Sequence, residues 1–392
     1  MGELQRPLRV GFYIFFSGGG IGRYTHRLME VMNARPDVEV EAFCSPDYEW
    51  VQADGYATWT GLQPLSHDVA TLRRLRFLRG QFVNPWRAVE YAIERGMDVF
   101  HLANINHLSF PFWRPALERS GLTVAASAHD IKRQKSIISR MWEDRQLKAF
   151  YRFADALFVH SQYQAQELQT FAGVDPSSVH VVPHGPYVHS PYPELDRSVL
   201  RAKWDAPQDH SVGLFFGQIR DEKNLGGCIR ALARCEAPVH LVVAGKEMGM
   251  RHRPPRYYRE VAREAGVTDR ITFHIGHVTD EEVAELFTAA DWVALPYRDT
   301  FTSQSGVLNV AAHYERPVLV AQAPVLRETV ENSGIGVVCD AETPHAIARG
   351  IKHMLELQRG NHAFPFMAYR ETYTWRENAR RTVAVYRGLQ GR

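Results

Sequence analysis

The segment Gly217–Asn224, with the sequence GQIRDEKN, places two cations three residues apart, directly after an apolar run. An arginine holds a diphosphate through two parallel hydrogen bonds, whereas a lysine acts as a compact point charge. Arg220 and Lys223 therefore form a candidate diphosphate site. The alternative is a solvated turn in which the two cations pair with Asp221 and Glu222, an arrangement of little energetic value.

A second anion-binding pattern lies between Pro296 and Pro317. An apolar run, Trp292–Leu295, leads into a loop rich in hydroxyl groups, and after this loop the apolar residues recur at helical spacing. The free amides and the positive dipole end of such a helix N-terminus bind phosphates. The candidate contacts are five consecutive residues: Ser303, Gln304, Ser305, Gly306 and Val307. The alternative is an ordinary helix cap by one of the two serines.

A glycine-rich loop, Ser17–Arg23, follows the first apolar run of the chain. Its glycines, Gly19, Gly20 and Gly22 among them, allow the backbone to approach a ligand before a predicted helix. A nicotinamide-binding fingerprint is disfavoured, because the last glycine of the G-x-G-x-x-G pattern is replaced by Arg23. A glycine-rich turn without a ligand remains the alternative.

Three further positions stand at the ends of predicted strands. His129 ends the run Thr123–Ala128, where it could donate a hydrogen bond to a ligand. A structural histidine satisfied by backbone groups is an equal alternative. Gly217, which opens the GQIRDEKN segment, follows the first predicted strand of the second half. The pair Gly245–Lys246 follows the next strand and is a similar but weaker candidate for the anion site.

Short apolar runs and helical patterns alternate along the chain. The predicted strands are 10–16, 38–43, 99–103, 123–128, 156–160, 179–183, 212–216, 239–244, 271–275, 292–296, 317–320 and 336–339. The predicted helices include 21–34, 133–154, 163–172, 225–235, 281–289 and 346–357. Most strands lack polar alternation, as is typical of parallel strands covered on both faces. This order predicts two doubly wound α/β domains joined through the proline-rich segment His184–Asp196, with ligands at the strand ends that face a cleft between the domains.

Composition limits the class of protein. The 392 residues are 45% hydrophobic and 23% charged, typical of a globular protein with two domains. A net charge of +2 does not indicate a nucleic-acid partner. Four separated cysteines and the first apolar run, which lacks a cleavage site, favour a cytoplasmic protein without disulfides. No metal motif such as D-x-D or H-E-x-x-H occurs, so we expect no metal and no cofactor.

These motifs and their order resemble the retaining glycosyltransferases of the GT-B fold, in particular glycosyltransferase family 4. The resemblance rests on the glycine loop, the His–Asp pair, HSQYQAQEL, VVPHG, GQIRDEKN, VVAG, ALPY, SGV and RPVL. It implies two Rossmann-like domains facing across a cleft, an acceptor-side domain at 1–190 and a nucleotide-sugar domain at 191–369. A last helix, around Trp375 to Leu389, would pack back on the first domain.

The resemblance also implies roles for the candidate residues. His129 would contact the donor sugar, Arg220 and Lys223 would neutralise the leaving diphosphate, and the amides of Ser305–Val307 would bind that diphosphate or the sugar. The glycine loop would face the donor phosphates and the acceptor.

Two departures from the family pattern are informative. Many relatives carry paired glutamates where this chain has Thr302 and Val310, which indicates the subgroup with a Ser-Gly-Val loop. The usual arginine after Gly217 is Gln218, with Arg220 two residues later.

We therefore expect a metal-independent transferase that moves a sugar from a nucleotide-sugar to an acceptor hydroxyl with retention, in polysaccharide or glycoconjugate synthesis. The acceptor would be a glycan, a lipid-linked glycan or a small molecule. A nucleotide-sugar epimerase or hydrolase and a non-catalytic binding protein are the alternatives. The basic and aromatic stretch Arg73–Arg87 could contact the inner face of a membrane, or it could be a solvated helix face with buried anchors.

Overall fold

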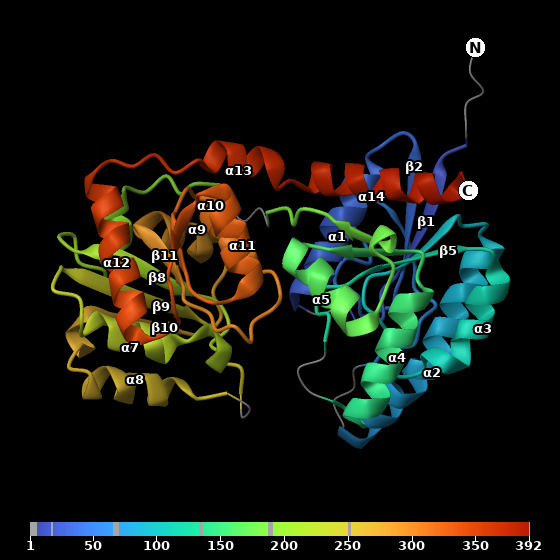
Figure 1. Ribbon diagram of the computed structural model, residues 1–392, viewed down its shortest axis with the longest axis horizontal. Helices are drawn as coiled ribbons and strands as arrows, with labels where there is room; N and C mark the ends of the chain where they lie inside the picture. The colour runs from blue at the N-terminus through green and yellow to red at the C-terminus, as the bar shows by residue number, and fades with distance from the viewer. Residues whose placement is uncertain are drawn as a thin grey trace, which may run out of the picture. The chain divides into compact units, whose positions relative to one another are not determined.

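The computed structural model describes residues 6–16, 19–65, 70–132, 136–186, 191–249 and 252–391. The chain divides into two compact units (Figure 1). Unit 1 is Met1–His184 together with Thr374–Arg392, and unit 2 is Gly185–Tyr373. The last helix therefore belongs with the first half of the chain.

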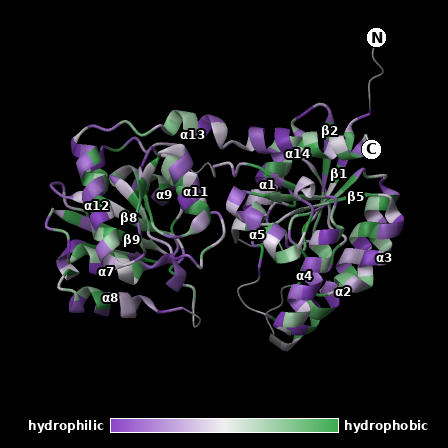
Figure 2. Cartoon of the chain, in the orientation of Figure 1, coloured by the Kyte–Doolittle hydropathy of each residue, from purple (hydrophilic) through white to green (hydrophobic). Residues whose placement is uncertain are grey.

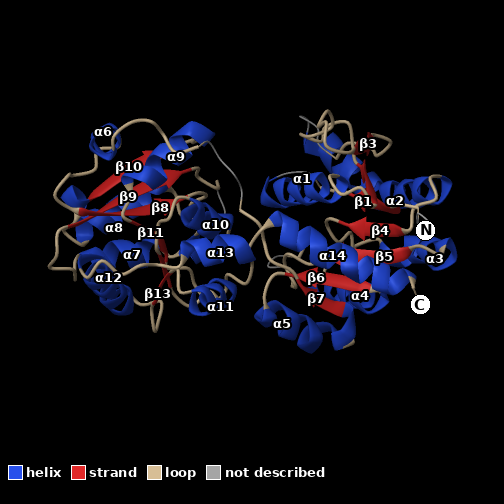
Figure 3. Cartoon of the chain, turned by 90° about the horizontal axis from the view of Figure 1, so that it is seen from above, coloured by secondary structure: helices blue, strands red, loops and turns tan. Residues whose placement is uncertain are grey.

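Unit 1 is built on a parallel sheet with the strand order β3-β2-β1-β4-β5-β6-β7 (Figure 3). Its strands are β1 (Leu8–Tyr13), β2 (Val38–Phe43), β3 (Ala57–Trp59), β4 (Val99–Leu102), β5 (Thr123–Ser127), β6 (Ala156–Val159) and β7 (Val179–Val181). The order reverses between β1 and β4, which pair directly with Val10 opposite Val99. The central strands are buried on both faces, and this explains their continuous apolar runs.

Helices cover both faces of this sheet. They are α1 (Gly19–Asn33), α2 (Ala70–Glu94), α3 (Phe110–Ser120), α4 (Arg140–Phe153), α5 (Gln162–Ala172) and α14 (Trp375–Gln390), with a 3-10 turn at Pro176–Ser178. Apolar side chains of α2, α3, α4 and α5 form one core with alternate strand residues, while α14 packs against α1, β5 and β6 on the other face. The apolar sides of these helices and the strands gather in the interior of the unit (Figure 2).

Helix α14 is fixed to unit 1 by a buried polar centre. Asn378 is fully buried, and its amide nitrogen donates to the hydroxyl of Tyr24 at 2.9 Å and to the carbonyl of Pro183 at 2.7 Å. Its side-chain oxygen accepts a hydrogen bond from Thr382 at 3.1 Å. The C-terminal helix therefore completes the unit through hydrogen bonds that water cannot replace.

Unit 2 is built on a second parallel sheet with the order β10-β9-β8-β11-β12-β13. Its strands are β8 (Ser211–Phe216), β9 (Val239–Gly245), β10 (Ile271–Ile275), β11 (Trp292–Leu295), β12 (Val318–Val320) and β13 (Gly336–Val338). Here the order reverses between β8 and β11, which pair in parallel.

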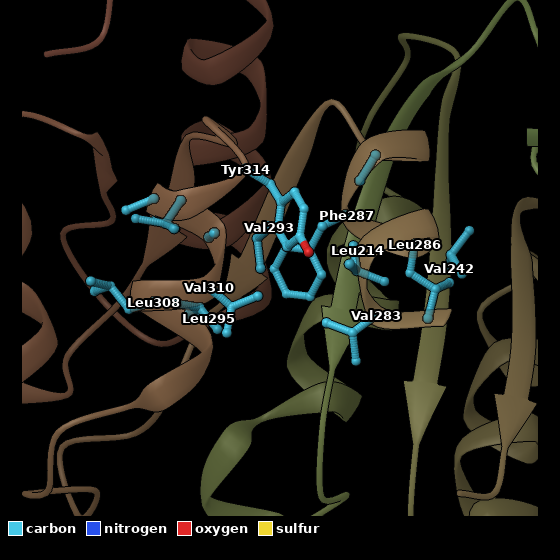
Figure 4. Packing of buried hydrophobic residues seen from close by; sticks show 14 of the residues in the cluster. Leu214, Val242, Val283, Leu286, Phe287, Val293, Leu295, Leu308, Val310 and Tyr314 are labelled. Carbon is cyan, nitrogen blue, oxygen red and sulfur yellow. The ribbon is translucent and has the colours of Figure 1, made fainter. Parts of the chain in front are cut away.

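Two helical layers sandwich this second sheet. The helices are α6 (Arg197–Lys203), α7 (Leu225–Leu232), α8 (Pro255–Glu264), α9 (Asp280–Ala289), α10 (Gly306–His313), α11 (Pro324–Ser333), α12 (Pro344–Arg359) and α13 (Phe366–Thr372), with 3-10 turns at Asp221–Lys223 and Thr268–Arg270. Strand β11 shows the division: Val293 and Leu295 face the core with α9 and α10, whereas Trp292 and Ala294 face α7 and α12. Figure 4 shows the first of these cores, including Leu308 and Val310 of α10.

The predicted doubly wound α/β architecture is confirmed, and each of the twelve predicted strands coincides with a strand of the structure. The prediction missed β3, because this strand has only three residues and none is buried. The predicted helix at 133–154 was wrong at its start, since α4 begins at Arg140; residues 133–135 lie outside the described residues. The carboxylate of Glu143 accepts hydrogen bonds from the backbone amides of Ile137 and Ile138, which holds this segment out of the helix.

We expect Asn378→Ala to lower the free energy of unfolding of unit 1 by about 2–4 kcal/mol, because three buried polar groups lose their partner. Hydrogen exchange followed by mass spectrometry would show faster exchange in peptides of unit 1 and unchanged exchange in peptides of unit 2. Arg376→Ala, on the exposed side of the same helix, is the matched control. Equal exchange in the two variants would contradict this role of Asn378.

Candidate functional site

The candidate anion residues of unit 2 follow the two strands at which the sheet order reverses. Gly217 comes directly after β8, and Tyr297 stands two residues after the end of β11. In open α/β sheets, ligands bind at the carboxyl ends of the strands where the order reverses. The fold therefore places the two loops with anion-binding sequences at the position expected for a ligand.

Three sequence-predicted residues meet at Gly217. Its φ of +98° lies in the region that favours glycine. A Cβ atom on Gly217 would lie 3.1 Å from Nζ of Lys223 and 3.6 Å from Cγ2 of Val307. A Cβ atom on Gly245 would stand 2.1 Å from the carbonyl oxygen of Gly217, so the two backbones are in direct contact. The structure thus brings Gly217, Gly245, Lys223 and Val307 together.

Lys223 is buried, with only 6% of its surface exposed. Its Nζ donates to the carbonyl oxygen of Phe216 at 3.3 Å and lies 5.3 Å from the ring centre of Tyr297. The pKa of Lys223 is lowered to about 7, mainly by burial and also by the nearby charge of Arg220, while Glu222 opposes the shift. An amine in this state gains or loses its charge near neutral pH and has much to gain from an anion.

Arg220 lies beside this amine but is partly exposed. Its guanidinium donates to the side-chain oxygen of Gln218 at 2.7 and 3.2 Å and to Glu222 at 3.3 Å. The alternative of a charged turn is thus realised in part, by Arg220 and Glu222. Asp221 instead accepts hydrogen bonds from Tyr258 and the amide of Arg253, so it holds the turn in place.

The N-terminus of α10 presents backbone amides in place of a serine cap. Ser305 occupies the N-cap position, but its side chain makes no capping hydrogen bond. The side-chain oxygen of Gln304 accepts from the amide of Ser305 at 3.2 Å. The Nε2 atom of Gln304 is buried and has no hydrogen-bond partner among the described residues. The amides of Gly306 and Val307 lie in the first turn of α10, where no helical carbonyl precedes them at hydrogen-bonding distance along the helix, so they can receive an anion.

Sequence reasoning missed the residues that join the two loops. The backbone amide of Arg298 donates to the carbonyl of Glu222 at 2.9 Å, and its guanidinium contacts Asn224 at 3.2 Å and Glu342 at 2.9 Å. Asn224 has a φ of +59° and donates to the carbonyl of Glu342 at 2.9 Å. The motif GQIRDEKN ends at Asn224, and the motif ALPY ends one residue before Arg298. These motifs were the signal in the sequence that could have led to both residues.

Two predicted residues of unit 2, Lys246 and Ser303, are less closely involved in the candidate anion site. The side chain of Lys246 is exposed, and its carbonyl accepts the amide of Ile219 at 3.0 Å. Ser303 is partly buried in the loop before α10.

In unit 1, the glycine loop and His129 come together at the other reversal point. Helix α1 begins at Gly19, and Gly20 and Gly22 lie in its first turn; Ser17 and Gly18 are outside the described residues. Ile21 of that turn lines a small pocket of about 30 Å³ with Asn104 and His129. This volume is enough for only a few water molecules.

His129 belongs to a cluster of aromatic rings. Its Nδ1 atom lies 3.3 Å from Nε2 of His160, and its ring meets the ring of Tyr24 edge-on at 4.6 Å. His184 lies against both Tyr24 and His160. Burial lowers the pKa of His129 well below its usual value, and the neighbouring histidines lower it further. His160 and His184 stand in the motifs HSQYQAQEL and VVPHG, although the sequence assigned them no role.

The described residues show neither a metal-binding cluster nor a membrane-spanning helix. No group of three or more His, Cys, Asp or Glu residues is arranged to hold a metal ion in the part of the chain that the structure describes. Among the helices with described residues, none is both long and apolar enough to cross a membrane.

Comparison with known families covers most of the chain. Residues 19–185 match the family described as "Glycosyl transferase 4-like domain", and residues 196–372 match "Glycosyl transferases group 1". The chain belongs to the group 1 glycosyltransferases. The resemblance found in the sequence is thus confirmed at the level of the family.

Individual group 1 proteins show the same relationship. The D-inositol 3-phosphate glycosyltransferase of Nocardioides sp. is 29% identical over 252 residues, which are 60% of this chain and 54% of that protein. The chain thus spans about half the length of the curated relatives it matches.

Solved structures share the fold over nearly the full chain. Sucrose-phosphate synthase from Thermosynechococcus elongatus has a TM-score of 0.75 at 18% identity and covers 98% of this chain and 99% of its own. HepE from Anabaena, in complex with UDP and glucose, has a TM-score of 0.69 at 18% identity and covers 98% of each chain. The GT-B fold with two Rossmann-like domains is therefore shown.

The burial of the Lys223 amine predicts that the free energy of unfolding of this group 1 protein depends on pH. The folded protein releases the Lys223 proton at a pKa of about 7, whereas the unfolded chain holds it up to the ordinary pKa of 10.5. Between these values the unfolded chain binds more protons, so the free energy of unfolding rises with pH. The cost of burying the amine is therefore greatest at or below pH 7.

We expect Lys223→Met to raise the melting temperature of the ligand-free protein, by roughly 2–4 °C for each kcal/mol of burial cost that is relieved. The gain should shrink as the pH rises from 7 toward 10, because wild-type Lys223 is then already neutral in the folded state. Differential scanning calorimetry across this range measures it, with the exposed Lys246→Met as control. A gain that is the same at every pH would contradict the buried cation.

Proposed function

We propose that this protein transfers a sugar from a nucleotide-sugar donor to an acceptor hydroxyl, with retention of configuration and without a metal ion. The observation that carries the proposal is the buried amine of Lys223, which lies against Gly217, and Gly217 in turn lies near Val307 in the first turn of α10. Membership in the group 1 family and the UDP and glucose bound by HepE agree with this proposal.

The chemical task is to stabilise the charge that grows on the leaving diphosphate. Lys223 has a pKa of about 7 in the free protein, and a bound diphosphate would raise that pKa and keep the amine charged. The half-exposed Arg220 supplies a second cation, and the amides of Gly306 and Val307 supply neutral donors. Because the protein itself provides this positive charge, the proposed reaction needs no metal.

Retention is proposed to occur on one face of the sugar. Val310 is buried in the apolar core of unit 2 and Thr302 carries a hydroxyl, so neither position supplies the carboxylate that many relatives have there. The leaving phosphate oxygen would accept the proton of the attacking hydroxyl as the new glycosidic bond forms. In unit 1 we assign His129 to a hydroxyl of the donor sugar and the segment Gly19–Gly22 to the donor phosphates and the acceptor.

The alternatives remain distinguishable by product. An epimerase or hydrolase would change the donor without an acceptor, and a non-catalytic protein would bind the nucleotide without turnover. The name of the Nocardioides relative makes inositol 3-phosphate the first small-molecule acceptor to test. Glycans and lipid-linked glycans are the other acceptor classes.

We expect Lys223→Met and Arg220→Ala each to lower kcat by about 10²–10³-fold, because each removes charge stabilisation from the transition state. The donor is first chosen by thermal shift with UDP-, GDP-, ADP- and dTDP-sugars. Turnover is then measured with EDTA present, and NMR identifies the anomer of the product. Lys352→Met, at an exposed position of α12, is the control for general loss of positive charge.

Three outcomes would overturn parts of this proposal. Near-normal kcat in Lys223→Met removes the role of the amine. An inverted anomer removes retention, and a loss of turnover in EDTA that Mg²⁺ or Mn²⁺ restores removes metal independence.

The structure also supports a membrane-contact surface on unit 1. Residues 71–76, the first turns of α2, are all exposed, and Leu72, Leu75 and Leu78 are 45–62% exposed. Isolated exposed leucines are ordinary, but a row of them on a projecting helix is typical of an interaction site.

Neighbouring elements extend the row. Phe82 of α2 contacts Phe112 of α3 at 5.2 Å, and both are exposed. The start of α4 adds Met141, which is 83% exposed, and Trp142, whose ring nitrogen donates to the carbonyl of Leu108 at 3.4 Å. Figure 1 shows the first turns of α2 and α4 at the same end of unit 1. We call these exposed apolar residues of α2, α3 and α4 the apolar end.

The positive charge of α2 indicates which kind of partner the apolar end would contact. Between residues 70 and 82, α2 carries four arginines (Arg73, Arg74, Arg76 and Arg79) and no acidic residue. Arginines interleaved with leucines are typical of helices that lie on anionic lipid headgroups. We therefore propose peripheral contact with an anionic membrane, which would suit a lipid-linked acceptor.

We expect the double substitution Leu75→Ser, Leu78→Ser to weaken binding to anionic vesicles about tenfold or more, because two apolar side chains no longer enter the interface. Flotation with phosphatidylglycerol and phosphatidylcholine vesicles measures this. Wild-type protein should float only with the anionic vesicles, and less so at high salt. Leu195→Ser, an exposed leucine in unit 2, is the control. No flotation at low salt would overturn the proposal, and self-association in sedimentation would reassign the surface to a second copy of the chain.

A further inference from the structure

Two histidines stand at the ends of neighbouring strands in unit 1. His129 lies two residues after β5, and His160 directly follows β6, its partner in the sheet. Gln164 holds both backbones: its side-chain oxygen accepts the amide of His160 at 2.9 Å, and its nitrogen donates to the carbonyl of His129 at 3.0 Å. Gln164 is fully buried, so the two rings are held in a fixed relation.

The contacts of His160 determine where its proton lies. Its Nδ1 atom is 3.2 Å from the carbonyl oxygen of Val182, which can only accept a hydrogen bond. Nδ1 of His160 must therefore carry the proton. In a neutral ring the other nitrogen, Nε2, then has a lone pair and can only accept.

The proton position in His160 in turn determines the proton position in His129. Its Nδ1 atom lies 3.3 Å from the accepting Nε2 of His160, so Nδ1 of His129 must be the donor. The Nε2 atom of a neutral His129 is then an acceptor. This atom is buried and has no hydrogen-bond partner among the described residues.

Other arrangements of the protons are disfavoured. Burial lowers the pKa of His160 to about 4 and that of His129 well below its usual value, so neither ring is charged near neutral pH. The opposite tautomer of His160 would set a lone pair against the carbonyl of Val182. The opposite tautomer of His129 alone would set two lone pairs against each other.

We propose that His160 is a positioning residue that fixes His129 as a neutral hydrogen-bond acceptor at Nε2. The group it can receive is an O–H or N–H donor, and within the proposed function, on which this assignment rests, that group is a hydroxyl of the sugar. A phosphate or carboxylate oxygen is excluded at this atom, because two lone pairs would meet. His129 therefore selects a hydroxyl, whereas the anionic part of the donor belongs to Lys223.

The direct test is nitrogen NMR of the ligand-free wild-type protein with ¹⁵N-labelled histidine. The signals of His129 and His160 are assigned by their loss in His129→Asn and His160→Gln. Near neutral pH we expect both rings to have a protonated, pyrrole-type Nδ1 and an unprotonated, pyridine-type Nε2. A protonated Nε2 on His129 would overturn the proposal, whatever the protein catalyses.

Variants of His160 test the consequence for binding. His160→Leu removes the acceptor for Nδ1 of His129, so we expect KM for the donor to rise roughly tenfold with a smaller change in kcat, as for a contact made equally in the ground and transition states. His160→Gln keeps an acceptor oxygen and should restore most of the affinity. The exposed His353→Gln is the control. If Leu and Gln behave alike while both variants keep the wild-type melting temperature, His160 has no positioning role.

Absence of turnover in the wild-type protein would contradict the proposed function. It would leave the tautomers assigned to His129 and His160 untouched, because the NMR experiment needs no substrate. If NMR shows the expected tautomer but KM is unchanged in His160→Leu, the proton assignment stands. The proposed contact between His129 and a sugar hydroxyl is then contradicted.

Discussion

The burial of a lysine without a carboxylate partner is the constraint on which the candidate site depends. Nζ of Lys223 is held by the carbonyl of Phe216 and the ring of Tyr297, both at the point where the second sheet reverses its order. A Cβ atom at position 217 would come within 3.1 Å of this Nζ, and one at position 245 would collide with the carbonyl oxygen of Gly217. This packing lowers the pKa of the amine to about 7, so an arriving anion meets a group whose charge it can stabilise.

The apolar core beneath α10 explains why the N-terminus of this helix offers backbone groups in place of a carboxylate. Leu308 and Val310 anchor the helix among β8, β9, β11 and α9 (Figure 4), and Asn309 is tied to Tyr369 at 2.6 Å. A carboxylate at Val310 would be buried without a partner, at a cost of several kcal/mol. The helix therefore offers its amides, fixed in position by packing, and Lys223 supplies the charge.

Unit 1 offers the opposite kind of chemistry. His129 and His160 are buried and uncharged near neutral pH, and the C-terminal helix closes their cluster through Trp375 and Asn378. A neutral acceptor at His129 suits the hydroxyl groups of a sugar, and a cation at Lys223 suits its diphosphate. In each unit the surroundings of one candidate side chain determine its protonation.

The sequence by itself determined the family, the two parallel α/β sheets and the loops that carry the candidate residues, because apolar runs and glycine-rich turns are local patterns. It did not determine β3, a strand of three residues of which none is buried. It also did not determine the start of α4, where the carboxylate of Glu143 binds the amide of Ile137 and holds that segment out of the helix. The protonation of Lys223 and the direction of the hydrogen bond at His129 were also decided by the tertiary structure. The sequence suggested His129 as a possible donor, whereas the contact between His160 and the carbonyl of Val182 is the basis for our proposal that Nε2 of His129 accepts. Burial and the proton needs of distant neighbours arise only when the chain is folded, so no local pattern records them.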